Sequence, residues 1–126
     1  MILPLTSDED PNPHVTIFLQ TDLTNMLTYS ILPTMNSYTC LGIQLNIDAP
    51  LTIINYYHHV VDKRPHLQHL LTLPLPDRPL LLCGDFNTHS PCWSPPELPT
   101  SPWAHTLEDW LDTGNLISLI PKGSVT

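Results

Sequence analysis

The residues whose types and spacing could do chemistry lie in one short stretch, Gly84 to His89, which reads GDFNTH. An uninterrupted apolar run, Leu80 to Cys83, precedes it and predicts a strand buried on both faces that leads into a polar loop. If the extended geometry continues for one more step, Asp85 and Asn87 point to one side and Phe86 to the other. A carboxylate can bind a divalent cation or accept a proton, and a carboxamide can donate to an anionic oxygen. The pair therefore suits phosphate-ester chemistry.

Extended to Trp93 as GDFNTHSPCW, the stretch resembles the Gly-Asp-Phe-Asn signature of the endonuclease/exonuclease/phosphatase superfamily. Its histidine and Trp93 are most similar to the endonuclease domain of non-LTR retrotransposons. Upstream, residues 53–57 (IINYY) resemble the strand ending in Asn-x-Tyr that supplies that family's active-site tyrosine. Downstream, residues 107–126 resemble the helix and strand that lead to the family's next active-site segment. Gly-Asp-x-Asn alone would also fit an ordinary turn, but three matches in order favour the family.

The resemblance implies an α/β (α+β) fold, with this chain as a fragment of a four-layered, two-sheet β-sandwich flanked by helices. Residues 14–126 would be the partial domain, and residues 1–13 an acidic, proline-containing leader that we expect to be disordered. The family's earlier asparagine and metal-binding glutamate have no convincing counterpart, although Gln20-Thr21-Asp22 faintly resembles its Gln-Glu pair. The family's Ser-x-Ile-Asp and closing Ser-Asp-His segments would lie past Thr126. We therefore expect both ends of the site to be missing.

The activity that the resemblance implies is hydrolysis of DNA phosphodiesters with Mg²⁺ or Mn²⁺. The family's roles would make Asp85 the metal-binding or water-activating carboxylate, Asn87 and Tyr57 donors to the phosphate, and His89 a residue at the mouth near the scissile strand. A lone carboxylate is a weak Mg²⁺ site, because such ions take several oxygen ligands. We therefore expect the isolated chain to bind the metal weakly and to be inactive or nearly so. The alternative is a non-catalytic globular remnant of a mobile element, or an interaction module.

Composition limits the classes of function. The 126 residues allow one modest core, and their net charge of -8 leaves no basic face for nucleic acid, so DNA binding should be weak. The odd number of cysteines, three, favours reduced thiols and an intracellular protein, in the nucleus or cytoplasm. The N-terminus has no basic n-region and no apolar run is long enough to cross a bilayer, so we expect neither a signal peptide nor a membrane protein.

Period-two alternation predicts the strands. In one of them, Leu41, Ile43 and Leu45 would form the core face, with Gly42 on a wetter face. A turn at 48–50 would join this strand to the next as a hairpin. The predicted strands cover 14–20, 26–32 (stopped by Pro33), 38–47, 51–57, 80–84 and 116–120.

Two helices are predicted. The first opens near Asp62, presents Leu67, Leu70 and Leu71 as an apolar stripe, and ends before Pro74. The second follows a long loop, with Ser101 as N-cap, Pro102 at its first position and Gly114 at its end. In this helix the spacing of Trp103, Leu107, Trp110 and Leu111 is typical of core residues rather than of a platform for bases.

Several of these residues have a plainer interpretation. Tyr57 could be a sheet-surface aromatic, and Trp93 is expected to cap its loop rather than contact a base. Zinc ligation is a further alternative, but the spacing of the candidates does not fit a zinc finger, and we interpret the histidines as solvated loop and helix-face residues. The candidate zinc ligands are His58, His59, His66 and His69, or Cys83, His89 and Cys92.

Overall fold

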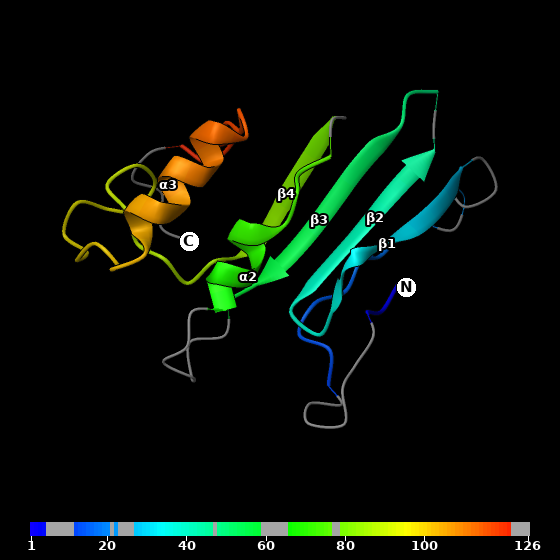
Figure 1. Cartoon of the computed structure of the whole chain (residues 1–126), viewed down its shortest axis with the longest axis horizontal. Coiled ribbons are helices and arrows are strands. Elements are labelled where there is room, and N and C mark those ends of the chain that lie inside the picture. Colours follow the sequence, from blue (N-terminus) through cyan, green and yellow to red (C-terminus); the bar gives the residue numbers. More distant parts are fainter. Residues whose placement is uncertain are drawn as a thin grey trace. The chain divides into compact units, whose positions relative to one another are not determined.

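The computed structural model describes residues 1–4, 12–20, 22, 27–46, 48–58, 66–76 and 79–121 (Figure 1). The chain divides into two compact units, Met1–Phe86 and Asn87–Thr126. The elements of the first unit, in chain order, are β1 (Thr28–Ser37), β2 (Cys40–Asn46), β3 (Leu51–Tyr57), α2 (His66–Thr72) and β4 (Leu80–Asp85). The second unit contains α3 (Ala104–Thr113).

The four strands form one sheet in the order β1-β2-β3-β4. The pairs β1–β2 and β2–β3 are antiparallel hairpins, whereas β3 and β4 run parallel. A parallel pair needs a long crossover between its strands, and α2 belongs to that connection. The architecture confirms the predicted mixed α/β class. The part of the chain that the structure describes contributes this single sheet, not the two sheets of the sandwich.

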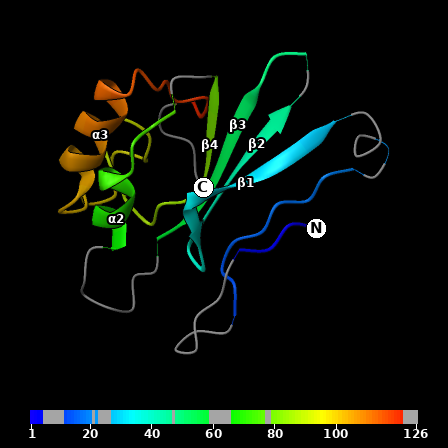
Figure 2. The same ribbon diagram turned by 45° about the vertical axis from the view of Figure 1, so that its right-hand side comes forward.

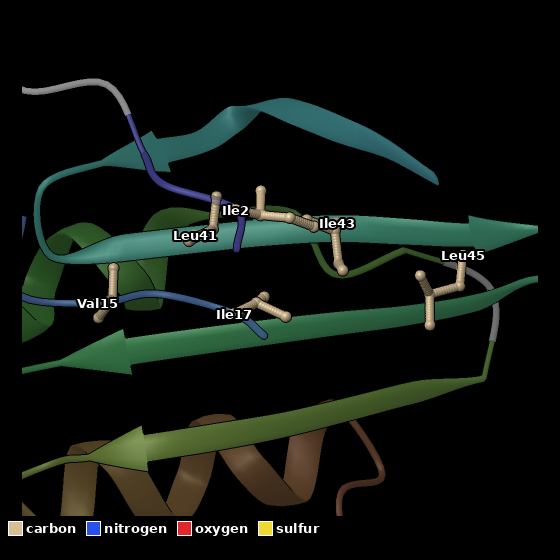
Figure 3. Packing of buried hydrophobic residues seen from close by; sticks show 6 residues of the cluster. All are labelled: Ile2, Val15, Ile17, Leu41, Ile43 and Leu45. Carbon is tan, nitrogen blue, oxygen red and sulfur yellow. The ribbon is translucent and has the colours of Figure 1, made fainter. Parts of the chain in front are cut away.

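One face of the sheet holds the core that the alternation predicted. Leu41, Ile43 and Leu45 on β2 are nearly or fully buried there. Extended N-terminal segments supply the other side of this cluster (Figure 3): Ile2, Val15 and Ile17. The expected leader therefore contributes Ile2 to the core, and Ile2 forms an isolated antiparallel bridge with Ile17.

The opposite face is also apolar, which corrects the expectation of a wetter surface around Gly42. That glycine is buried, and a Cβ there would lie 2.7 Å from the Met35 Cβ. Tyr56 on β3 is 1 % exposed. The helix α2 lies on the other side of the sheet from the N-terminal segments (Figure 2), and its Leu67 and Leu70 are fully buried. The predicted stripe on this helix is thus confirmed at Leu67 and Leu70, whereas Leu71 is only partly buried. Its predicted start at Asp62 lies outside the described residues.

Two predicted strands in the N-terminal third were wrong in extent. Residues 14–20 form only the bridge at Ile17 rather than a strand. β1, by contrast, does not stop at Pro33 but continues to Ser37. β1 is an edge strand, so the N–H that Pro33 lacks need not interrupt the hydrogen bonds between strands. The register of β1 with β2 shifts between Ile31 and Asn36, the interval that contains this proline.

The strand that precedes the candidate site is less buried than predicted. β4 is the other edge of the sheet, and Leu81 is 40 % exposed, with Cys83 and Gly84 exposed as well. An uninterrupted apolar run fits a strand covered on both faces, but here half of the run faces outward.

In the second unit, α3 begins after Trp103, and no side chain caps it. The Ser101 hydroxyl, predicted as the cap, instead accepts the backbone N–H of His89 at 2.8 Å. The predicted end at Gly114 is confirmed, since its N–H donates to the carbonyls of Trp110 and Asp112. Leu107 is buried as predicted, but Trp103 is 42 % exposed and Trp110 only partly buried, so the core assignment of the tryptophans was wrong. Residues 116–120 form no strand.

Candidate active site

Tyr57 and Asp85 end two adjacent parallel strands and are register partners in the β3–β4 pair. Neighbouring strands lie about 4.8 Å apart, and paired residues project from the same face of a sheet. That face is the one of Ile53, which packs against the core cluster. Asp85 is exposed and Tyr57 partly buried. The fold therefore brings together, side by side at one sheet end, two residues that are 28 positions apart in the sequence.

Gly84 sets the approach of β4 to β3. Its φ is +144°, a conformation that side-chain-bearing residues rarely adopt. A Cβ at this position would overlap the carbonyl oxygen of Tyr56, its register partner. Glycine is therefore needed immediately before the aspartate, because only glycine allows the two strands to come this close.

The Tyr57 ring is held by a neighbour that no sequence motif indicated. The His14 imidazole stacks on it with ring centroids 5.3 Å apart and planes 9° from parallel. His14 is fixed in turn by its backbone N–H, which donates to the Tyr38 carbonyl at 2.9 Å, and by an edge contact with the Tyr38 ring. The N-terminal segment stays on this face because the Asn55 amide donates to the Thr16 carbonyl at 3.0 Å. Only the folded sheet brings residues 14 and 57 together.

His58 holds the backbone around Asp85. Its N–H donates to the Asp85 carbonyl and its Nδ1 lies against the Phe86 carbonyl, both at 2.8 Å. The side chain is 7 % exposed, so the interpretation of His58 as a solvated residue was wrong. The Phe86 ring packs against Tyr56, with centroids 5.6 Å apart.

Asn87 and His89 belong to the second unit, and both are exposed. Asn87 has a φ of +45°, so the extended geometry ends before it. The expected alternation of Asp85, Phe86 and Asn87 was therefore wrong. Asparagine tolerates this left-handed conformation better than most residues. The His89 backbone N–H donates to the Ser101 hydroxyl, and its carbonyl accepts the Ser101 N–H. The His89 Nδ1 lies 3.5 Å from the Ser94 hydroxyl.

The loop after Asn87 is organised by buried polar contacts that sequence reasoning missed. Ser90, 1 % exposed, donates its hydroxyl to Glu108 on α3 and accepts the Cys92 N–H at 2.9 Å. The hydrogen bond from Ser90 lowers the pKa of Glu108, with smaller contributions from His105 and Cys92. The Trp93 indole N–H donates to the Thr88 carbonyl at 2.8 Å, which is a loop-stabilising contact. Spacing alone did not indicate the Ser90–Glu108 pair, 18 residues apart.

Comparison with family models gives a match over residues 51–126, to the model described as "Endonuclease-reverse transcriptase". The chain belongs to this endonuclease/exonuclease/phosphatase family. The matched range contains all four residues predicted for the site. A solved structure, the endonuclease domain of TRAS1, a telomere-specific non-LTR retrotransposon, has the same fold, with a TM-score of 0.63 and 20 % sequence identity. The match covers 78 % of this chain and 46 % of that one. A search of curated proteins finds no match.

The family relationship implies a divalent metal, but the residues at hand do not fit one. Within the described ranges, no three His, Cys, Asp or Glu side chains are grouped so that they could hold an ion. Asp85 would supply one carboxylate where Mg²⁺ takes an octahedral set of ligands.

The cysteines, all three of which are described, are free thiols, with Cys40 buried and Cys83 and Cys92 exposed. None of the helices placed by the structure is long and apolar enough to cross a bilayer.

Proposed function

We propose that this chain carries part of the active site of an endonuclease-type phosphodiesterase. The observation that carries the proposal is the register pairing of Tyr57 with Asp85 at the carboxyl ends of two parallel strands. Ligands of open α/β sheets commonly bind outside the carboxyl ends of the strands. Membership of the endonuclease-reverse transcriptase family supports the same assignment.

The proposed chemistry assigns each residue one task. The Asp85 carboxylate orients the attacking water and accepts its proton as the new oxygen–phosphorus bond forms and the bond to the leaving sugar oxygen breaks. The Tyr57 hydroxyl donates a hydrogen bond to a non-bridging phosphate oxygen, where negative charge increases in the transition state. The family resemblance also assigns Asn87 a hydrogen bond to a phosphate oxygen and His89 a role near the scissile strand.

We further propose that the isolated chain is inactive or nearly so. When bound, Mg²⁺ or Mn²⁺ would stabilise charge on the leaving oxygen, and Asp85 by itself is an incomplete site for it. The net charge of -8 also opposes binding to DNA, whose affinity for proteins depends mainly on neutralised phosphates. Activity would then require the further ligands of a complete domain.

A non-catalytic interaction module is the second candidate. Apolar side chains at the end of the described chain favour it, since Ile117 is 83 % and Leu119 77 % exposed. Exposed apolar residues that lie close together often mark a surface for a partner.

A plasmid-nicking assay tests the proposal. The purified chain is incubated with supercoiled DNA and either Mg²⁺ or Mn²⁺, beside Asp85→Ala, Asn87→Ala and the matched control Asp112→Ala, an exposed acid on α3. We expect no nicking above that of the Asp85 and Asn87 variants, from chains that circular dichroism shows to be folded. Metal-dependent nicking that the Asp112 variant retains and the other two lose would contradict the predicted inactivity and confirm the assigned residues. Nicking that all four chains share would contradict the assignment itself.

A further inference from the structure

His58 is a buried polar residue beside the candidate site, and the proposed chemistry gives it no role. Its side chain is 7 % exposed, and it directly follows the candidate phosphate-binding tyrosine. Two hydrogen bonds from His58 reach consecutive carbonyls at the end of the neighbouring strand, those of Asp85 and Phe86, each at 2.8 Å. A buried polar side chain normally has a hydrogen-bonding partner, but two bonds to adjacent peptides also fix the orientation of both.

We propose that His58 is a positioning residue that fixes the backbone from which the Asp85 carboxylate projects, together with the peptide leading to Asn87. The bond from its N–H extends the β3–β4 pairing to the aspartate carbonyl, and the bond from its ring holds the next carbonyl as the chain leaves the strand. With both carbonyls held, the backbone from which the Asp85 side chain projects is fixed at the strand end. This inference rests on the proposed function, in which Asp85 is the reacting carboxylate.

The ring bond has a defined chemical form. A carbonyl oxygen can only accept, so Nδ1 must carry the proton and donate it to Phe86. This form of the neutral imidazole leaves Nε2 without a proton. An asparagine side chain places an N–H donor at the position of Nδ1, whereas a glutamine places it nearer that of Nε2. His58→Asn therefore keeps the bond to Phe86, and His58→Gln and His58→Ala lose it.

The experiment compares the full chain with these three variants and with His69→Gln, a matched change of an exposed histidine on α2. Long-range ¹H–¹⁵N spectra of the wild type report which ring nitrogen of His58 is protonated. Amide hydrogen exchange of residue 58 reports how often its bond to the Asp85 carbonyl opens. Titration with inorganic phosphate, followed at the amides of Tyr57 and Asp85, reports whether the site takes the anion.

We expect a proton on Nδ1 in the wild type and unchanged exchange in the His58→Asn and His69→Gln variants. In the His58→Gln and His58→Ala variants we expect exchange about tenfold faster, the effect of losing one buried hydrogen bond. Equal exchange in His58→Asn and His58→Gln, a proton on Nε2 alone, or unfolding of the His58→Asn variant would each overturn the proposal. Absence of any phosphate response in the wild type would contradict the proposed function, while the exchange comparison would still decide the role of His58.

Discussion

Tyr57 and Asp85 are register partners at the carboxyl ends of the parallel strands β3 and β4. Each is placed by a different neighbour, because His14 stacks on the tyrosine ring and His58 binds the aspartate carbonyl. The candidate site is therefore built from three separate parts of the first unit, around residues 14, 57–58 and 85, and sequence motifs indicated only Tyr57 and Asp85.

Gly84→Ala should strongly destabilise the first unit. At Gly84 the φ of +144° is a backbone conformation that is strained for any residue with a side chain, and the added Cβ would overlap the Tyr56 carbonyl oxygen. We expect a loss of about 3 kcal/mol in the free energy of unfolding, measured by urea denaturation. The control is Gly114→Ala, where φ is −79° and the change should stay within about 0.5 kcal/mol. Equal effects at the two glycines would show that β4 does not approach β3 as described.

The stack of His14 on Tyr57 should appear as a coupling energy. A double-mutant cycle with His14→Ala and Tyr57→Ala isolates the pair from the separate cost of each truncation. Aromatic pairs contribute about 1 kcal/mol beyond their buried area, and we expect a coupling of that size. His14→Phe should keep most of it, because a phenyl ring can occupy the same plane. A coupling indistinguishable from zero would mean that the N-terminal segment does not hold the tyrosine.

Ile2→Ala should cost about 2 to 4 kcal/mol in unfolding free energy, because the side chain is 5 % exposed and packs in the core cluster. Leu3→Ala is the adjacent control, since Leu3 is 46 % exposed. Thermal or urea unfolding of both variants measures the difference. If the two changes cost the same small amount, the first residues do not belong to the core.

The contact between Ser90 and Glu108 predicts a loss of stability in acid. The pKa of Glu108 is lowered in the folded chain from its ordinary value of 4.5, first by the Ser90 hydrogen bond. The unfolded state therefore binds this proton more readily. The stability that ionised Glu108 contributes is fully present above the ordinary pKa. It is lost as the pH falls through the lowered pKa of the folded chain. Melting temperatures of wild type and Glu108→Gln should differ most near neutral pH and converge in acid. A difference that grows as the pH falls would contradict the assignment.

The sequence predicted the centre of the sheet well, for a physical reason. Leu41, Ile43 and Leu45 lie on one face of β2, and that face packs in the core cluster, so the period-two alternation of the sequence reports it directly. The strand before the motif was also placed correctly, although an apolar run does not report whether its strand lies at an edge. β4 does, and much of it is exposed.

The errors arose where distant contacts decide the structure. Pro33 is a strong local stop signal, but an edge strand tolerates it. Ser101 has the form of an N-cap, yet its hydroxyl binds the N–H of His89 across the loop. The motif residues of the candidate site were predicted from resemblance. His14 and His58 could not be predicted, because His14 lies 43 positions from Tyr57 and His58 lies 27 positions from Asp85. Their roles follow from the register of the folded sheet.

The most direct test of the central claim is to map a phosphodiester onto the chain. Thymidylyl-thymidine is titrated into the ¹⁵N-labelled protein, and amide shifts are followed in the wild type and in Tyr57→Phe. We predict that the largest shifts fall at Tyr57 and Asp85, with an affinity about fivefold weaker in the phenylalanine variant, the effect of losing one hydrogen bond to the phosphate. Shifts that fall elsewhere, or an affinity that the loss of the hydroxyl leaves unchanged, would contradict the claim that these two residues form part of a phosphodiesterase site.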